Sequence, residues 1–188
     1  MAHLLAVNVP LKRDPAWSDW AKMTRSKIKS AGVLVKRWQL FYYHMTILFL
    51  DDDACVKTLT PEFAKMVKSC PALPMTIDKL DAFTTSDGAE HIIYLSSTQV
   101  PSQIFTLAND ARTLADSLNI DYDKRPFKPH ITFGKVQADK MSLEDLQTIL
   151  RSLEQPAFDC VLEEAEHRYR KTKIKDKGTI KKWKLHSK

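Results

Sequence analysis

The stretch His44–Leu50 (HMTILFL) returns 86 residues later as residues 130–136 (HITFGKV). Each copy opens with a histidine, an apolar residue and a threonine and continues as a short apolar run, which predicts a β-strand. Side chains alternate between the two faces of a strand. The pair His44 and Thr46, and the pair His130 and Thr132, are therefore each expected on one face. Apolar side chains are expected on the opposite face, in a core: Met45, Ile47, Phe49, Ile131 and Phe133.

The segments around the two copies follow one order: strand, helix, His-x-Thr strand, helix, strand. Strands are expected over residues 4–9, 75–83, 92–97 and 157–163, and helices over 15–31, 60–69, 103–118 and 142–153. The first strand precedes the histidine by 40 residues in one half and by 38 in the other. This agreement predicts an internal duplication within a single bilobal domain over residues 1–188. A pseudo-twofold axis is expected to set the two His-x-Thr strands face to face across a cleft.

Two helix starts have recognisable capping residues. For the helix that ends near residue 69, Thr60 is the predicted N-cap and Pro61 is the predicted first helical residue. Ser142 and Asp145 have the spacing of a capping box.

The composition indicates a protein that folds without disulfides. A chain of 188 residues is long enough to bury a substantial core. The three cysteines, Cys55, Cys70 and Cys160, have no CxxC spacing, which favours a reducing compartment. No stretch resembles a signal peptide or reaches the roughly 20 apolar residues of a membrane span. We therefore expect a soluble, cytoplasmic monomer that does not contact membranes.

The positive charge is concentrated at the end of the sequence. Residues 168–188 contain ten Lys or Arg and one Asp, whereas residues 1–167 contain 19 basic and 22 acidic residues. Alternating arms around Asp176-Lys177-Gly178 predict a basic C-terminal hairpin. Such a hairpin can attract RNA, or its lysines can simply protect a sheet edge.

Two histidines and two threonines on matching strands suit displacement at phosphorus. One neutral imidazole can accept a proton while a second, charged imidazole donates one. Thr46 and Thr132 can donate hydrogen bonds to the two non-bridging phosphate oxygens. This chemistry requires no metal or other cofactor. The sequence contains no HExxH or CxxC ligand pattern, no glycine-rich phosphate loop and no nucleophile elbow.

The two motifs resemble the signature of the 2H phosphoesterases. Residues 125–135 (RPFKPHITFGK) are similar to the second motif of the RNA 2′,3′-cyclic phosphodiesterases, also called 2′-5′ RNA ligase-like proteins. The resemblance extends from the strand at residues 4–9 through residues 80–83 to the second motif. It implies an α+β fold in which two lobes of antiparallel sheet, flanked by helices, surround a central cleft.

The resemblance also implies a reaction, the metal-independent opening of an RNA-type 2′,3′-cyclic phosphate to a 2′-phosphate. The residues alone leave the order of acid and base open, and the resemblance favours His130 as the base and His44 as the acid. Two alternatives remain. The same site can join or cleave 2′-5′ linked RNA or 2′-5′ oligoadenylate, as some relatives do, or the protein can be a basic RNA-binding module with an inactive site.

Four further residues are candidates for substrate binding. Lys128 shares a face with His130, and Tyr42 shares a face with His44, so each can line the mouth of the cleft. Phe83 lies in a segment that resembles the aromatic wall of the family and can stack a base. Lys135 replaces the arginine that many relatives carry, and on an ideal strand it faces away from His130. It reaches the cleft only if the strand bulges.

Overall fold

The computed structural model describes residues 2–50, 53–170 and 177–186. Its main sheet is antiparallel and has the strand order β10-β9-β1-β3-β7-β6-β5, with β2 also paired to β7, and β4 and β8 form a separate pair. The strands are β1 (Ala2–Asn8), β2 (Val35–Trp38), β3 (His44–Leu50), β4 (Leu73–Ile77), β5 (Lys79–Thr84), β6 (Glu90–Ser96), β7 (Ile131–Gln137), β8 (Phe158–Leu162), β9 (Glu164–Arg170) and β10 (Lys177–Lys184). The helices are α1 (Trp17–Ser30), α2 (Leu59–Ser69), α3 (Ser102–Ser117) and α4 (Leu143–Ser152), with short 3₁₀ turns η1 (Leu11–Arg13) and η2 (Asp53–Val56).

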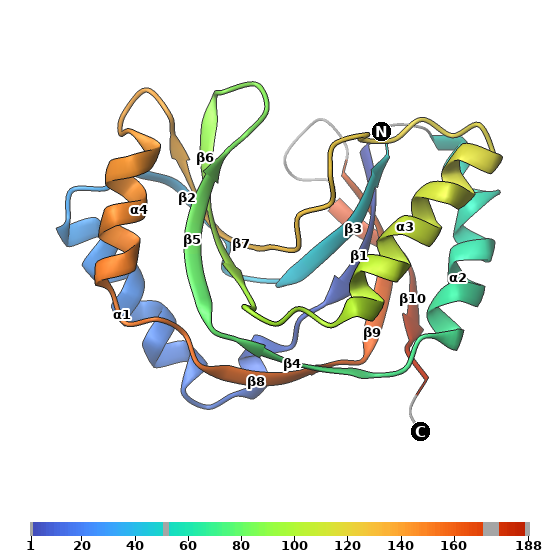
Figure 1. Ribbon diagram of the computed structural model, residues 1–188, viewed down its shortest axis with the longest axis horizontal. Helices are drawn as coiled ribbons and strands as arrows, with labels where there is room; N and C mark the ends of the chain where they lie inside the picture. Colours follow the sequence, from blue (N-terminus) through green and yellow to red (C-terminus); the bar gives the residue numbers. More distant parts are fainter. Residues whose placement is uncertain (1, 51–52, 171–176, 187–188) are drawn as a thin grey trace.

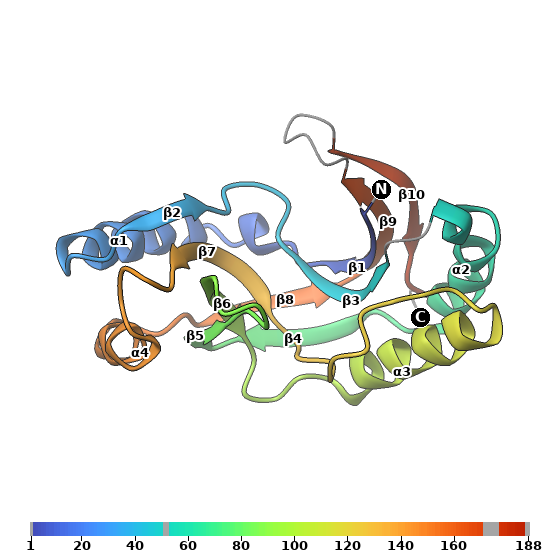
Figure 2. The ribbon, with the colours of Figure 1, turned by 90° about the horizontal axis from the view of Figure 1, so that it is seen from above.

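Matching elements occupy matching places on the two sides of the β3–β7 pair. β1 and β9 follow β3 on one side, and β6 and β5 follow β7 on the other. Helices α2 and α3 lie on the first side and α1 and α4 on the second, while β4 and β8 run beneath both (Figure 1). The view from above shows the same division (Figure 2). The α+β fold with antiparallel sheets flanked by helices confirms the predicted fold class.

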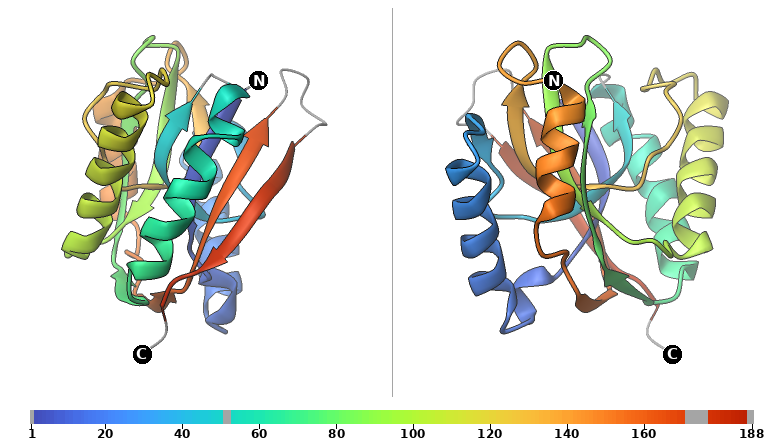
Figure 3. Two further views of the ribbon diagram at one scale, coloured as in Figure 1. Left: turned by 90° about the vertical axis from the view of Figure 1, so that its right-hand side faces the viewer. Right: turned by 60° about the vertical axis from the view of Figure 1, so that its left-hand side comes forward.

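The two halves of the chain are interleaved across this arrangement. Strand β5 follows α2 in sequence but pairs with β6, and β9 follows β8 but returns to pair with β1. In the side views, α2 and α3 stand together against one side of the molecule, although three strands separate them in sequence (Figure 3). Each side of the sheet is therefore built from both halves of the sequence.

The expectation that the two His-x-Thr strands face each other across a cleft is wrong. β3 and β7 are neighbours in one sheet, and Met45 pairs with Ile131. Pairing satisfies backbone groups that two separate lobes would leave exposed at their edges. The two motifs therefore meet side by side.

A β-bulge follows the threonine in both motif strands. Leu5 pairs with Leu48 and Ala6 with Thr46, so Ile47 is an extra residue in β3. In β7, Thr132 and Gly134 pair with consecutive residues of β6, so Phe133 is the extra residue. An extra residue reverses the facing of the later residues in its strand. For this reason Phe49 is 39 % exposed, contrary to its predicted place in the core.

The bulge residue Phe133 anchors β7 in an aromatic cluster. Its ring is fully buried and lies 5.7 Å from Trp20 of α1 and 5.4 Å from Trp38 of β2, measured between ring centroids. The next residue, Gly134, has its position for a β-carbon only 2.9 Å from the Trp38 ring. A glycine is needed there for the indole to pack over β7.

Several local predictions need correction. The strand expected over residues 75–83 is divided into β4 and β5, because Asp78 turns the chain and accepts a 2.7 Å hydrogen bond from the Thr98 amide. Thr60 does not cap α2: the N-cap is Thr58, and the Thr60 hydroxyl donates instead to the Cys55 carbonyl. Ser142 does cap α4 and accepts from the Asp145 amide at 3.1 Å.

The basic hairpin belongs to the main sheet. Strands β9 and β10 pair with each other, and β9 pairs with β1. Of the predicted turn, Asp176 lies outside the described residues, and Lys177 and Gly178 belong to β10. Among the helices of the described ranges, none combines the length and the hydropathy that crossing a membrane requires.

Replacing Phe133 by alanine tests the role of the bulge anchor. We expect Phe133→Ala to lower the free energy of unfolding by about 3–5 kcal/mol, because it empties a fully enclosed aromatic site. Phe41→Ala is the matched control. Its ring is 62 % exposed, and its loss should change stability by less than about 1 kcal/mol. Urea unfolding measures both variants, and equal losses would contradict the prediction.

Candidate active site

The register of the β3–β7 pair gathers the two motifs into one group of four side chains. Because Met45 lies opposite Ile131 in an antiparallel pair, the residues one step away are also opposite one another. This sets His44 across from Thr132 and His130 across from Thr46. Thr46, His130 and Thr132 line one cavity, and His44 lies close enough to His130 to lower its pKa. The two histidines are diagonal neighbours, a relation that separates backbones by about 7–8 Å.

Both imidazoles are held in the same way. His44 Nδ1 lies 2.8 Å from the carbonyl oxygen of Tyr42, and His130 Nδ1 lies 2.8 Å from the carbonyl oxygen of Lys128. A carbonyl oxygen only accepts, so in each ring Nδ1 carries the hydrogen and donates it. The Nε2 atom of each ring is therefore the one that remains available for proton transfer. Each Nε2 can accept a proton in the neutral ring or donate one in the charged ring.

The charges around the two rings differ. Burial lowers the pKa of both histidines below 6.5. At His130 the neighbouring cations Lys128, His44 and Arg125 lower the pKa further. At His44 the nearby Arg168 lowers the pKa and Glu166 raises it. The charged neighbours that shift the pKa of His130 are thus all cations, whereas those of His44 include a carboxylate.

A cavity of about 480 Å³ opens over this face of the sheet. Its floor includes the motif residues Thr46, His130 and Thr132, and its walls come from β5, from the end of α3 and from the segment before β7. The cavity is large enough for a nucleotide-sized ligand.

Two predicted binding residues lie directly against His130. The Phe83 ring meets the imidazole edge to face at 5.1 Å, and the Lys128 ammonium lies 4.4 Å from the centre of the Phe83 ring. Tyr94 of β6 completes this group, 5.4 Å from Phe83 and 6.2 Å from His130. Burial lowers the pKa of Lys128. The cation is therefore held in a partly apolar setting where an anionic ligand can reach it.

Lys135 reaches the cavity because of the bulge in β7. The extra residue at Phe133 turns Lys135 to the cavity side. Its ammonium donates to Glu90 at 2.8 Å, and Lys36 donates to the same carboxylate. These two cations lower the pKa of Glu90 to about 2. Lys135 is thus a cavity residue whose charge is shared with an acidic partner.

Tyr42 lies apart from this cavity. Its side chain is 67 % exposed, its φ is 57°, and its ring stacks under the Arg168 guanidinium at 4.6 Å. Tyr42 and Arg168 line a separate cavity on the outer side of His44. The backbone carbonyl of Tyr42, rather than its ring, supports the histidine.

Sequence reasoning missed several residues at the site. Phe49 lines the cavity only because of the bulge in β3, and Arg112 reaches it from the polar side of α3. The Arg112 Nε is buried and, within the described part of the chain, has no hydrogen-bond partner. Arg168 comes from the basic hairpin. A repeat alignment could have indicated Phe49, since it stands five residues after His44 as Lys135 does after His130. Arg168 is the first residue of the basic C-terminal segment, but no sequence pattern indicates Arg112.

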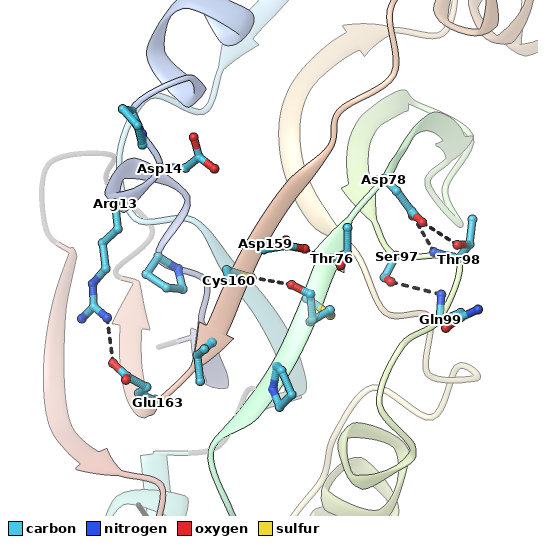
Figure 4. A pocket seen from close by; sticks show the side chains of 15 residues that line it. Arg13, Asp14, Thr76, Asp78, Ser97, Thr98, Gln99, Asp159, Cys160 and Glu163 are labelled. Atoms are coloured by element: carbon cyan, nitrogen blue, oxygen red, sulfur yellow. Dashed lines mark hydrogen bonds and ion pairs between the residues drawn. The ribbon is translucent and has the colours of Figure 1, made fainter.

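A larger cavity lies elsewhere. It measures about 850 Å³ and lies between η1, the β4–β8 pair and the loop after β6. Its polar side chains are engaged with one another: Arg13 with Glu163, Thr76 with Asp159, and Thr98 with Asp78 (Figure 4). It contains no histidine. The smaller cavity over the two motifs is therefore the better candidate for an active site.

Comparison with known proteins gives consistent results. A family model described as the 2′-5′ RNA ligase superfamily matches residues 13–172. No curated protein sequence matches the chain. Among solved structures, Escherichia coli LigT in its apo form superposes with a TM-score of 0.69 at 19 % identity, covering 98 % of this chain and 96 % of LigT. Usb1 from Kluyveromyces marxianus superposes with a TM-score of 0.60 at 10 % identity, covering 95 % of this chain and 97 % of Usb1.

Titration of the histidines tests the geometry without reference to any activity. By NMR, we expect the neutral rings of His44 and His130 to be protonated at Nδ1. Both should titrate below 6.5, because burial disfavours the charged form. In His44→Gln, the pKa of His130 should rise, because a neighbouring positive charge has been removed. An unchanged His130 titration in that variant would show that the rings do not interact.

Proposed function

The chain belongs to the 2′-5′ RNA ligase superfamily of 2H phosphoesterases, and from this premise we propose that it hydrolyses RNA-type 2′,3′-cyclic phosphates to 2′-phosphates. Membership in the superfamily supports an enzyme that acts on phosphodiester bonds. The observation that carries the finer proposal is the pair of imidazoles on one face, each with Nδ1 bound to a backbone carbonyl and Nε2 left for proton transfer.

The proposed reaction is a displacement by water at phosphorus. His130 Nε2 accepts a proton from the water as its oxygen attacks the phosphorus. The bond between phosphorus and the 3′ oxygen breaks, and His44 Nε2 donates its proton to that oxygen. The products are a 2′-phosphate and a 3′ hydroxyl. Two diagonal histidines suit this division of labour, because the attacking and leaving oxygens are on opposite sides of the phosphorus.

The surrounding charges support this assignment of base and acid. A base must be neutral before the reaction, and the cations Lys128 and Arg125 beside His130 favour its neutral form. An acid must be charged: burial and Arg168 lower the pKa of His44, and Glu166 partly offsets them, whereas no carboxylate offsets the cations at His130. After one turnover the proton has moved from His44 to His130, so exchange with solvent must restore the starting state.

Thr46 and Thr132 are proposed to stabilise the negative charge that develops on the phosphate. Each threonine lies across the β3–β7 pair from one histidine, as the register requires, and both hydroxyls border the cavity. A hydroxyl can donate to a non-bridging oxygen, and such donors act most strongly where the charge increases in the transition state.

The cavity walls support a nucleotide as the substrate. Phe49 on β3 and Phe83 on β5 line the cavity from the two sides of the β3–β7 pair, and each ring offers a face for a base. Lys128, Lys135 and Arg112 supply positive charge for a phosphate backbone. Among the structural relatives, LigT has been crystallised with 3′-AMP (TM-score 0.68, 17 % identity) and with NADP+ (TM-score 0.64, 19 % identity).

Histidine variants test the proposed chemistry. We expect His44→Ala and His130→Ala each to lower kcat on a 2′,3′-cyclic nucleotide by at least about 10²- to 10⁴-fold, since each removes one proton-transfer group. His186→Ala is the control, because His186 is exposed and lies outside the cavity. Chromatography of the product should show the 2′-phosphate.

The same assay separates the alternatives. Release of a 3′-phosphate would contradict the assigned leaving oxygen. Turnover of 2′-5′ oligoadenylate without turnover of the cyclic nucleotide would favour the ligase and oligoadenylate branch. RNA binding with turnover of neither substrate would favour a binding module with an inactive site.

A second variant tests the proposed base contact. Phe49→Ala should raise KM for a cyclic nucleotide by about 5- to 100-fold with a smaller effect on kcat, because stacking on one aromatic ring is worth about 1–3 kcal/mol. Phe41→Ala removes a ring of the same kind that is exposed away from this cavity. Steady-state kinetics of both variants should separate them, and equal KM values would count against a base at Phe49.

A further inference from the structure

A second pair of histidines meets on the other face of the same sheet. His3 of β1 and His167 of β9 are 2 % and 0 % exposed, and their rings lie 5.1 Å apart. Cys55 of η2 is fully buried beside them. We propose that His3, Cys55 and His167 form a binding site for a divalent transition metal ion with the preferences of zinc. The site is separate from the proposed active site.

The outer nitrogen of each ring has an acceptor. His3 Nε2 lies 2.9 Å from the Asp53 carboxylate, which can only accept, so this nitrogen carries a hydrogen. His167 Nδ1 lies 2.7 Å from the Thr60 hydroxyl. That hydroxyl also lies 3.1 Å from the Cys55 carbonyl oxygen, and when it donates there its oxygen accepts from His167 Nδ1. In this arrangement the hydrogen of each neutral ring is on the outer nitrogen.

In that arrangement the inner nitrogens are lone-pair donors directed at each other. His3 Nδ1 and His167 Nε2 are 3.1 Å apart. Two lone pairs at this distance repel, so this arrangement needs a cation beside both nitrogens, and a metal ion is one. In the other tautomer of His167, Thr60 donates to Nδ1 and Nε2–H donates to His3 Nδ1 without a cation.

The thiol of Cys55 favours the metal. Its Sγ lies 3.9 Å from His167 Nε2, and the three inner atoms all lie within 4.8 Å of one another. Zinc bonds of about 2.0–2.1 Å to nitrogen and 2.3 Å to sulfur place tetrahedral ligands about 3.3–3.6 Å apart. Two imidazoles and a thiolate occupy three of the four positions of such a site, and small movements bring them to these separations.

The neighbouring groups resemble the outer shell of a metal site. A ligating histidine generally donates its other N–H to a carboxylate or another acceptor, which orients the ring and raises its basicity. Asp53 does this for His3 and Thr60 for His167. The arrangement joins β1, η2, α2 and β9, so a bound ion would connect segments near both ends of the sequence.

The metal site does not overlap with the catalytic histidines. Along β1, His3 pairs with Leu50 and Asn8 pairs with His44, a separation of five residues or about 16 Å. On β9, His167 faces the metal cluster, whereas Arg168 and Glu166 face His44 because strand side chains alternate. A metal bound here would stabilise the strand that carries these two charges without contacting a phosphate in the cavity.

Titration with Co²⁺ tests the site directly. The full chain is stripped with a chelator under reducing conditions, and Co²⁺ is then added while the visible spectrum is recorded. We expect one Co²⁺ per chain, with the intense bands of a tetrahedral ion and a charge-transfer band from thiolate to cobalt. Zn²⁺ should remove both features and raise Tm. Absence of the charge-transfer band would overturn the proposal and leave a hydrogen bond between the two rings.

Matched variants separate this site from other ligands. Cys55→Ser should lose the charge-transfer band, whereas Cys160→Ser should keep it. The double variant His44→Ala, His130→Ala should also keep it, since the cavity histidines are not ligands. Asp53→Asn provides a test that does not disturb the core, because the Asp53 side chain is 64 % exposed. It should weaken Co²⁺ binding by about 10- to 100-fold. Unchanged binding in both Cys55→Ser and Asp53→Asn would refute the assignment.

Discussion

The antiparallel pairing of β3 with β7 is the constraint on which the rest of this structure depends. Met45 pairs with Ile131 at the centre of the sheet, and both are fully buried. A shift of one residue would turn His44 or His130 into the core and a buried apolar side chain out to solvent. The cost of that exchange maintains the register, and the register in turn brings two histidines and two threonines onto one surface.

The two sides of this pair share a backbone plan but differ in charge. Both strands have a bulge after the threonine, and both histidines donate Nδ1–H to the carbonyl two residues earlier. Phe83 and Lys128 lie beside His130. The ion pair of Arg168 with Glu166 lies near His44. The two motifs thus share a backbone arrangement, whereas the charges beside each histidine differ.

Strand β9 has a different role on each of its faces. Glu166 and Arg168 lie toward His44, and the intervening His167 is directed into the buried cluster with His3 and Thr60. The strand comes from the end of the sequence but completes the sheet beside β1. The electrostatic environment of His44 therefore depends on how firmly β9 is held, and the buried histidine cluster is one of the contacts that hold it.

The sequence by itself determined the superfamily, the α+β class, and the alternation that sets His44 beside Thr46 and His130 beside Thr132, because these properties depend on local pattern. Tertiary structure alone decided that the two strands are neighbours rather than opposed, that Phe49 and Lys135 turn into the cavity, and that His3, Cys55 and His167 meet. The bulges arise from pairing with β1 and β6, and the buried cluster joins residues separated by as many as 164 positions. Neither is encoded in a short stretch of sequence, since each depends on which strands share an edge.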